Sequence, residues 1–379
     1  MIRVHWFSMF LWFLRAASRH LRLVPLLLLV LLVPQVVVAA GQATPVAGDA
    51  PRPLAFPADS GPHDEAATEW WYYTGHLETE DDELYGFEYV IFRGNRGGVE
   101  GFVSHFAVTD NPRGEFASAQ QIVAAEGARG DRFAMDLDVN GWTMRGESGR
   151  DRLRAVMADY AINLQLQPGK PVVPHDGDGY IDYGNGTFSW YYSRTRMPVE
   201  GILTVDGEDK LVSGDAWMDH QWGNFTTFED GGWDWYAVQL DDGSEVMLYV
   251  IHDGQGTQLI VDGSLLDAAG NLSILEAEDF AVEATGEWTS SETGTVWPSG
   301  WTIAVPAAGL DLTVTPTMPE QELDTRYTTG IIYWEGQSLV EGTRDGQPVT
   351  GRAYVELTGY APVEAAGALG PAATPKTTP

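Results

Sequence analysis

Residues 212–219 read VSGDAWMD, and residues 349–356 read VTGRAYVE. The two stretches share one pattern, Val-x-Gly-x-Ala followed by an aromatic, an apolar and an acidic residue. Residues 161–168, AINLQLQP, recur in the same order as residues 309–316, GLDLTVTP. Motifs that repeat in order along a chain indicate two copies of one structural unit. The sequence therefore predicts an internal duplication.

An aromatic segment near the start of each copy gives a third match. In the first copy, Trp71-Tyr72 is followed by Tyr89-Val90-Ile91. In the second copy, Trp235-Tyr236 is followed by Tyr249-Val250-Ile251. We predict that the two dipeptides are equivalent, and likewise the two tripeptides.

Short segments rich in aromatic and β-branched residues recur along the chain, with Gly-rich turns between them. Residues 69–78 and 84–93 flank an acidic turn, which predicts a β-hairpin. Short, regularly spaced strands without long helical periodicity predict an all-β protein, either a barrel or a sandwich. Further strands are predicted at 101–109, 133–139, 142–147, 152–158, 160–166, 188–196, 201–205 and 211–219.

The repeat and the local composition divide the chain. We predict two β-domains, the first over residues 54–228 and the second over 229–363. Residues 41–53 are predicted to form a linker rich in Pro, Ala and Gly, and residues 364–379 a disordered tail of Ala, Pro and Thr.

The first 40 residues predict export. They contain four arginines and no acid, and an apolar run over residues 23–40 ends in Val-Ala-Ala before Gly41. This is the pattern of a signal peptide. An uncleaved single-span anchor is the alternative. Both interpretations place the body of the chain in the periplasm or outside the cell, and allow membrane contact only through an uncleaved N-terminal segment.

The charge and the cysteine count exclude several classes of function. The net charge of −32 disfavours nucleic acid and anionic membrane surfaces as partners. The absence of cysteine excludes disulfides, thiolate metal sites and thiol nucleophiles. The chain has no G-x-S-x-G elbow, phosphate-binding loop or dinucleotide fingerprint, and its histidines show no HExxH or H-x-H spacing. We therefore predict no cofactor and no metal.

The stretch GDAWMDHQWGNF, residues 214–225, concentrates an acid, an imidazole and two indoles. Alternation along a strand would place His220 and Trp222 on one face, and Trp217 and Asp219 on the other. Two interpretations are open, a buried polar plug whose groups are satisfied by the backbone and a site that handles protons. In the second copy, Glu356 is the acid equivalent to Asp219, but no imidazole or indole follows it. Asp219 could therefore also serve the fold alone.

Two other histidines are candidates for ligand contact. His63 lies in the sequence GPHDE, which is either a plain loop or part of the rim of the same pocket. His105 shares a predicted strand face with Val103 and Ala107, so it is either a satisfied core histidine or a residue that faces the barrel interior.

Four stretches together resemble a known family: FPADSGPHDEAATEWWYYTG, YGFEYVIFR, GDAWMDHQWG and GQPVTGRAYVELTGY. The chain is similar over residues 54–362 to AttH-type lipocalin-like proteins. These include carotenoid 1,2-hydratases, also called hydroxyneurosporene synthases, and are often labelled predicted secreted hydrolases. The resemblance implies two tandem lipocalin-like antiparallel β-barrels. It also implies that His220 and Trp222 match the His-x-Trp at the pocket of the hydratases.

One position departs from the family pattern. The hydratases carry a Tyr-x-Asp on a later strand, with the Asp as proton donor, whereas Tyr249 is followed by Ile251 here. Asp253 falls in a turn, and Asp219 is the remaining candidate donor if it faces the pocket. The resemblance then implies a cofactor-free hydro-lyase that protonates a carbon–carbon double bond of an apolar, terpenoid-like substrate. His220 would orient the water, and Trp222, Trp217 or Trp235 would stabilise the cation.

Three functions compete at this point. The first is such a hydratase, with Asp219, His220 and Trp222 as catalytic residues. The second is a binding protein that holds an apolar small molecule without changing it. The third is a secreted hydrolase, for which no nucleophile motif is visible. In each case the ligand-binding candidates are Trp217, Trp235, Tyr249, His105 and His63.

Overall fold

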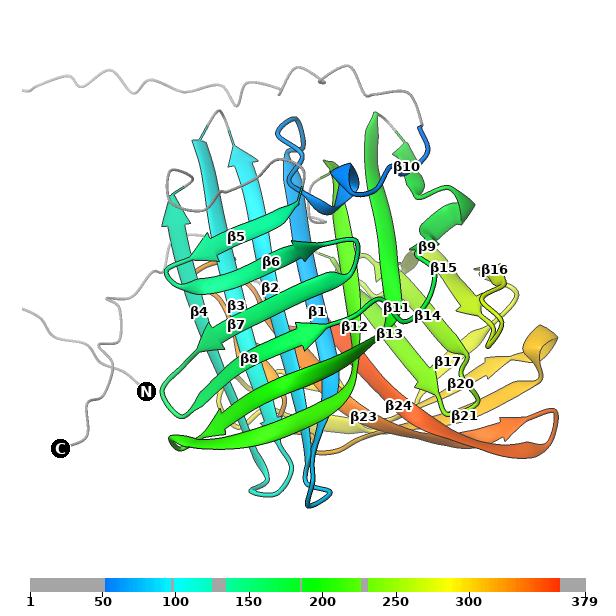
Figure 1. The fold of residues 1–379 in the computed structure, drawn as a ribbon. Helices are drawn as coiled ribbons and strands as arrows, with labels where there is room; N and C mark the ends of the chain where they lie inside the picture. The colour runs from blue at the N-terminus through cyan, green and yellow to red at the C-terminus, as the bar shows by residue number, and fades with distance from the viewer. Residues whose placement is uncertain (1–51, 97–98, 125–133, 185, 226–230, 362–379) are drawn as a thin grey trace, which may run out of the picture. The chain divides into compact units, whose positions relative to one another are not determined.

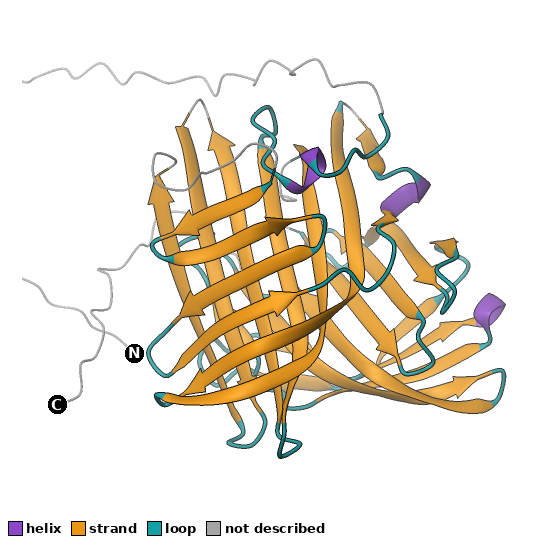
Figure 2. Ribbon diagram, viewed as in Figure 1, coloured by secondary structure: helices purple, strands orange, loops and turns teal. Residues whose placement is uncertain are grey.

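A computed structural model describes residues 52–96, 99–124, 134–184, 186–225 and 231–361. These residues form antiparallel strands joined by turns, with the short 3-10 helices η1 (Ala58–Ser60), η3 (His175–Gly177) and η4 (Pro306–Ala308) (Figures 1 and 2). The predicted signal peptide, most of the predicted linker and the predicted tail lie outside the described residues. Within the described part, no helix has the length and apolar character needed to span a membrane.

The first half of the described chain forms a 12-stranded sheet with the order β4-β3-β2-β1-β12-β11-β8-β7-β6-β5, in which β9 and β10 also pair with β11. Its end strands β4 and β5 contact each other, so this sheet is a nearly closed barrel. The strands are β1 (Thr68–Thr79), β2 (Leu84–Arg96), β3 (Val99–Asp110), β4 (Glu115–Ala124), β5 (Met135–Val139), β6 (Trp142–Glu147), β7 (Arg150–Val156), β8 (Tyr160–Leu166), β9 (Val173–Pro174), β10 (Tyr180–Gly184), β11 (Thr187–Val205) and β12 (Glu208–Asn224).

The second half forms a 10-stranded sheet with the order β16-β15-β14-β13-β24-β23-β21-β20-β17, in which β22 also pairs with β23. This order matches that of the first sheet strand for strand from β16 to β20. The strands are β13 (Gly232–Leu240), β14 (Glu245–His252), β15 (Gln258–Leu266), β16 (Leu272–Glu276), β17 (Ala281–Ala284), β20 (Trp301–Val305), β21 (Leu310–Pro316), β22 (Glu322–Asp324), β23 (Ile332–Arg344) and β24 (Gln347–Leu357), and β18 (Glu287–Thr289) pairs with β19 (Val296–Pro298) as a separate ribbon.

The strand register confirms the duplication and corrects one of its details. Tyr72 pairs with Asp219 in the first sheet, and Trp235 pairs with Glu356 in the second. Tyr72, rather than Trp71, is therefore the equivalent of Trp235. The prediction that Trp71-Tyr72 matches Trp235-Tyr236 was wrong by one residue, and a slip of one residue exchanges the two faces of a strand.

The same slip affects the next strand. Tyr72 pairs with Val90, whereas Trp235 pairs with Tyr249. Val90 is therefore the equivalent of Tyr249, and the two Tyr-Val-Ile tripeptides are not equivalent. The other two matches, of residues 161–168 with 309–316 and of 212–219 with 349–356, are confirmed. In the first sheet Val199 pairs with both Leu166 and Gly214. In the second sheet Val340 pairs with both Val314 and Gly351, which are the equivalent positions.

Each predicted strand overlaps an observed one, and there are several differences. The segments predicted at 188–196 and 201–205 belong to one long strand, β11, whose pairing with β12 shifts between Arg194 and Met197. The strand predicted at 152–158 is β7, at 150–156, and the first residue of the one predicted at 133–139 lies outside the described residues.

Strands β4, β9 and β10 were not predicted. Strand β4 is an edge strand with no fully buried residue, so it lacks a sharp alternation of apolar and polar residues.

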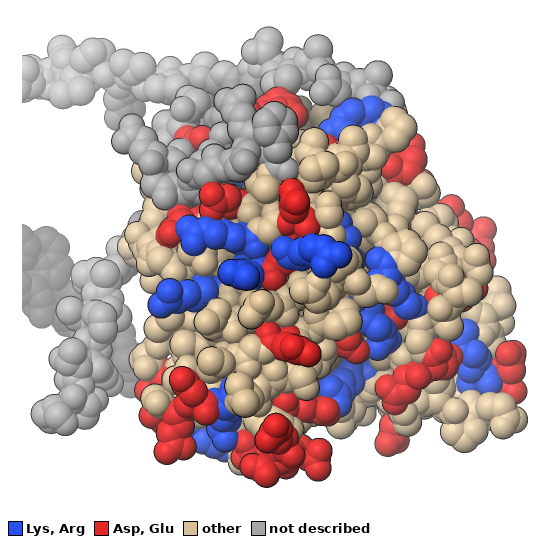
Figure 3. All heavy atoms as spheres, viewed as in Figure 1, with Lys and Arg blue, Asp and Glu red and all other residues tan. Residues whose placement is uncertain are grey.

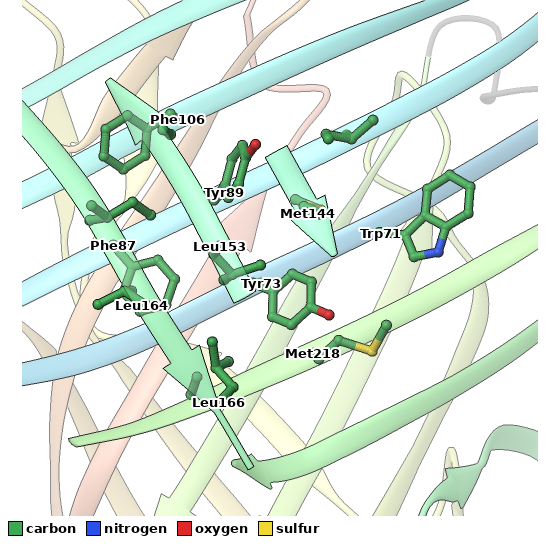
Figure 4. Packing of buried hydrophobic residues seen from close by; sticks show 14 of the residues in the cluster. Trp71, Tyr73, Phe87, Tyr89, Phe106, Met144, Leu153, Leu164, Leu166 and Met218 are labelled. Carbon is green, nitrogen blue, oxygen red and sulfur yellow. The ribbon is translucent and has the colours of Figure 1, made fainter. Parts of the chain in front are cut away.

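Each sheet encloses its own hydrophobic core. In the first barrel, aromatic side chains of β1 to β3 pack against aliphatic side chains of β7 and β8 (Figure 4). Trp71, Tyr73 and Tyr89 are among the fully buried residues. Side chains on the opposite face of β1 and β12 point away from this core, and Tyr72 and Trp217 among them pack against the second sheet.

A third cluster of buried side chains joins the two sheets. Tyr72, Tyr191 and Trp217 of the first sheet pack with Trp235, Tyr249 and Tyr354 of the second. Hydrogen bonds cross the same junction, from Tyr72 to Glu335 at 2.8 Å and from Trp235 to Tyr191 at 3.2 Å. We call this region the sheet junction. It lies within one compact unit over residues 45–379, and the division at residues 228 and 229 into two domains stays a prediction.

Charged groups are distributed unevenly over the surface. On the face shown in Figure 3, basic side chains cross the middle and acidic side chains gather toward the lower edge. The two signs lie close together over most of this face.

The Val-x-Gly motif needs its glycine because the backbone of the neighbouring strand lies where a Cβ atom would be. A Cβ on Gly214 would lie 1.9 Å from the carbonyl oxygen of His76, and one on Gly351 would lie 2.4 Å from that of Gln239. We expect Gly214→Ala to lower the free energy of unfolding by about 1–3 kcal/mol, because β1 must shift away from β12. Urea denaturation checks this. Gly94→Ala is the matched control, since a Cβ there meets nothing within 4 Å, and equal losses in both variants would contradict the account.

Candidate functional site

Alternation along β12 divides the predicted site residues between two places. His220 and Trp222 face the interior of the first barrel, where both belong to or contact its core. Trp217 and Asp219 face the sheet junction. This separation agrees with the period-2 prediction. It also means that His220 and Asp219 cannot act on the same atom from one pocket.

In the first barrel, His220 belongs to a buried network centred on Glu69 of β1. His220 Nε2 lies 2.9 Å from Glu69 Oε1, and His63 Nδ1 lies 2.8 Å from the same oxygen. His63 stacks on Trp222 at 3.8 Å, and His220 stacks on Trp71 at 4.7 Å. His63, placed by sequence in a loop or on a pocket rim, is therefore buried in the same network as His220.

The segment before β1 carries the rest of this network. Asp59 of η1 contacts both histidines, through its carboxylate to His63 and through its carbonyl oxygen to His220. Arg93 of β2 lies 3.4 Å from Glu69 Oε2, and it also donates to the carbonyl oxygen of His63. Burial alone would raise the pKa of Glu69, but the histidines and their hydrogen bonds outweigh it and lower this pKa to about 2. Glu69 is therefore ionised.

At the sheet junction, Asp219 accepts three hydrogen bonds. Trp217 Nε1 donates to Oδ1 at 2.7 Å, Ser193 Oγ donates to the same oxygen, and Tyr191 Oη donates to Oδ2 at 2.6 Å. Burial raises the pKa of Asp219 to about 6, against the opposing effect of these donors. Three donors and no acceptor define a site built for an ionised carboxylate.

A second group of carboxyls, drawn from both sheets, lies around Glu356, on which Asp219 acts across the junction. Glu356 of β24 is half-buried and pairs directly with Glu335 of β23. Burial raises the pKa of Glu356 to about 8, and the charge of Asp219 adds to this effect. Burial likewise holds the pKa of Glu88 and of Glu335 well above the usual range. The junction therefore combines an ionised acid with protonated ones.

Polar atoms at the junction lack partners among the described residues. Both carboxylate oxygens of Glu88 and Oε1 of Glu335 are buried without a hydrogen bond there. A buried polar atom without a partner costs about 1–3 kcal/mol, so such atoms mark places where a ligand or water is expected. A cavity of about 10 Å³ lies between residues of the two sheets, lined by residues that include Thr74, Trp217 and Tyr354.

Trp235 and Tyr249 also line the sheet junction, and their predicted contact with a ligand stays a prediction. Trp235 packs edge-to-face on Tyr72 at 5.4 Å and on Trp217 at 5.9 Å. Tyr249 pairs with Asp262 of β15, whose pKa burial raises to about 6. An acidic residue, Asp262, is therefore the direct cross-strand partner of Tyr249. Because Asp262 lies on a neighbouring strand, a search for Tyr-x-Asp in the sequence does not find it.

Ile251 and Asp253 lie where the sequence placed them. Ile251 packs in the junction cluster opposite Trp233. The carboxylate of Asp253 accepts from the backbone N–H groups of Gln255 and Thr257, which makes it a turn residue.

His105 joins the two sheets. Its Nδ1 lies 2.6 Å from Tyr333 Oη, and its Nε2 lies 2.9 Å from Thr328 Oγ1. Burial lowers the pKa of His105 to about 3, which makes it neutral. Both ring nitrogens therefore have partners in the second sheet, and His105 matches the interpretation of a satisfied buried histidine.

A serine beside Asp219 bears on the hydrolase alternative. Ser193 Oγ lies 2.7 Å from His175 Nε2 and also bonds to Asp219. In a nucleophilic triad the histidine stands between the serine and the acid, and the acid orients the imidazole. Here the serine stands in the middle. This order does not favour a serine nucleophile.

The chain was compared with known proteins. A family model described as AttH-like matches residues 47–360. The crystal structure of a protein assigned to AttH, from Nitrosomonas europaea, is 33% identical with a TM-score of 0.75, and the match covers 82% of this chain and 98% of that one. A comparison with curated proteins finds no match.

Two more distant structures share the fold. Kievitone hydratase from Nectria haematococca is 18% identical with a TM-score of 0.65, and the match covers 82% of this chain and 94% of that one. The protein CghA, in complex with Sch210972, is 13% identical with a TM-score of 0.53, and the match covers 82% and 97% of the two chains.

Proposed function

The chain belongs to the AttH-like family, and we propose that it is a hydratase that adds water across a carbon–carbon double bond of an apolar, terpenoid-like substrate at the sheet junction. The observation that carries the proposal is the placement of a protonated carboxyl, Glu356, near an ionised carboxylate, Asp219, in an aromatic surrounding. The fold shared with kievitone hydratase is consistent with it.

The reaction needs an acid that stays protonated at neutral pH. Glu356 would transfer its proton to the less substituted alkene carbon, which leaves a tertiary carbocation and the Glu356 carboxylate. Water would then bond to the cation and lose a proton to Asp219. A proton must return from Asp219 to Glu356 before the next cycle, and the accessible surface that Glu356 retains allows solvent to carry it. The net reaction adds one water to one double bond.

The aromatic side chains suit the cationic intermediate. The faces of indole and phenol rings attract positive charge. Trp217, Trp235 and Tyr72 surround Asp219 at the junction. The cavity of about 10 Å³ has room for about one water molecule. A larger substrate therefore requires the facing side chains of the two sheets to part.

In this proposal His220 and Trp222 are positioning residues. They fix the inner face of β12, whose outer face carries Asp219 and Trp217. Their direct catalytic role stays a prediction. Export and the apolar nature of the ligand also stay predictions.

The proposal is tested by turnover in labelled water. The purified full-length chain is incubated with acyclic terpenoid alkenes in H₂¹⁸O, and the products are analysed by mass spectrometry. We expect a tertiary alcohol that carries ¹⁸O. An alkene that is bound and recovered unchanged would overturn the hydratase and favour the binding protein instead.

A further inference from the structure

The network around Glu69 has the geometry of a metal site. His63 Nδ1 and His220 Nε2 both point at Glu69 Oε1, at 2.8 and 2.9 Å. These three ligand atoms lie within 4.8 Å of one another, and all three side chains are buried. The ligands come from the segment before β1, from β1 and from β12, so no short spacing in the sequence reveals them.

The outer nitrogens of both histidines are held by a single residue. His63 Nε2 lies 3.3 Å from the Asp59 carboxylate, and His220 Nδ1 lies 3.1 Å from the Asp59 carbonyl oxygen. Tyr192 Oη lies 3.3 Å from the same Nδ1 of His220. Metal-bound histidines typically donate their other N–H to a carboxylate or a backbone carbonyl in this way.

The inner nitrogens lie at hydrogen-bond distance from Glu69 Oε1, so in the metal-free protein a ring proton holds this position. A histidine ligand must present a lone pair, and metal binding therefore releases such protons. A divalent ion would take their place between the two inner nitrogens and Oε1, with bonds of about 2.0–2.2 Å.

The surroundings hold the ligands in place. Glu69 Oε2 accepts from the backbone N–H of His63 at 3.0 Å and lies near Arg93, so Oε1 remains for an ion. Trp222 and Trp71 stack on the two imidazoles and fix their planes. Arg93 is paired with Glu100, and Asp59 is paired with Arg52. Glu69 therefore supplies the carboxylate that would face the ion.

We propose that His63, Glu69 and His220 bind one divalent transition-metal ion, through Nδ1, Oε1 and Nε2 respectively. The ion would be structural, because tryptophan rings cover the imidazoles and the site lies on the face of β12 opposite Asp219. It would pin the segment that carries Asp59 and His63 to the barrel wall. This inference is independent of the hydratase proposal.

The test measures metal directly in the full-length chain. Elemental analysis is made on protein purified from zinc-supplemented cells, and Co²⁺ is titrated into chelator-treated protein while its visible absorption is followed. We expect one ion per chain in at least one of these experiments, and a higher melting temperature with metal than without. Substoichiometric metal in both, with an intact circular dichroism spectrum, would overturn the proposal.

Variants locate the ion. His63→Gln and His220→Gln are each expected to weaken Co²⁺ binding at least about tenfold. His252→Gln is the matched control, because His252 is also a buried histidine with a carboxylate neighbour but lies in the second sheet. Equal binding by all three variants would place the ion elsewhere and overturn the assignment. Should either ligand variant fail to fold, the wild-type stoichiometry still decides.

Discussion

Glu356→Gln is expected to slow ¹⁸O incorporation into product by about 10²- to 10⁴-fold, which is the usual contribution of a positioned general acid. A glutamine fills the same space but has no acidic proton to give to an alkene. The fold should survive, because the substitution removes a carboxyl whose burial already disfavours its ionised form. Initial rates measured beside wild type, with melting curves on the same samples, check this.

Asp151→Asn is the matched control for this experiment. Asp151 is a buried acid whose pKa burial raises to about 6, and it accepts a hydrogen bond from Tyr73 inside the first barrel. It lies away from the sheet junction, so its loss should leave the rate within a few-fold of wild type. Equal rate losses in Glu356→Gln and Asp151→Asn would show that removing any buried acid slows the reaction by disturbing the fold. That result would contradict the assignment of Glu356 as the proton donor.

Glu69→Gln is expected to lower the free energy of unfolding by about 3–5 kcal/mol, the cost of removing one partner of a buried ion pair. Glu69 has no exposed surface, and its two oxygens contact His63, His220 and Arg93. The substitution removes the carboxylate charge near the guanidinium of Arg93. It also places a side-chain amide, which has an NH₂ group, against the N–H donors that contacted the carboxylate. Urea denaturation of the two proteins gives the difference.

Glu100→Gln provides the comparison for that loss. Glu100 pairs with the same arginine, but 22% of its side chain is exposed. An ion pair near solvent contributes about 1 kcal/mol or less. Similar small losses in both variants would contradict the view that Glu69 is the centre of a buried network.

The duplication could be predicted because each copy must repeat the same close contacts. The glycine of Val-x-Gly recurs, since in both sheets a neighbouring backbone oxygen occupies the place of a Cβ. The register of the aromatic strands could not be set in the same way. Trp71-Tyr72 and Trp235-Tyr236 look alike, and only the pairing with β12 and β24 shows that they are one residue out of step.

The candidate site was predictable along one strand and not between strands. Alternation separates His220 from Asp219 without any knowledge of their partners. The partner of His220 is Glu69, 151 residues away, and the carboxyls that act on Glu356 come from β2, β12 and β23. No spacing in the sequence encodes such meetings, because they depend on strand order and on which sheet face is covered.

The central claim is that a protonated carboxyl, Glu356, stands near an ionised one at the sheet junction. Its proton is held by burial, and the groups that face it are Asp219, Glu88, Glu335 and Tyr72. A raised pKa means that Glu356 stays protonated below about pH 8 and loses its proton above it.

Infrared difference spectroscopy of wild type against Glu356→Gln measures this directly through the C=O stretch of a protonated carboxyl. The account predicts a protonated-carboxyl band in wild type at pH 7 that is absent from the variant and disappears from wild type as the pH rises through about 8. A spectrum in which Glu356 contributes only carboxylate bands at pH 7 would contradict it.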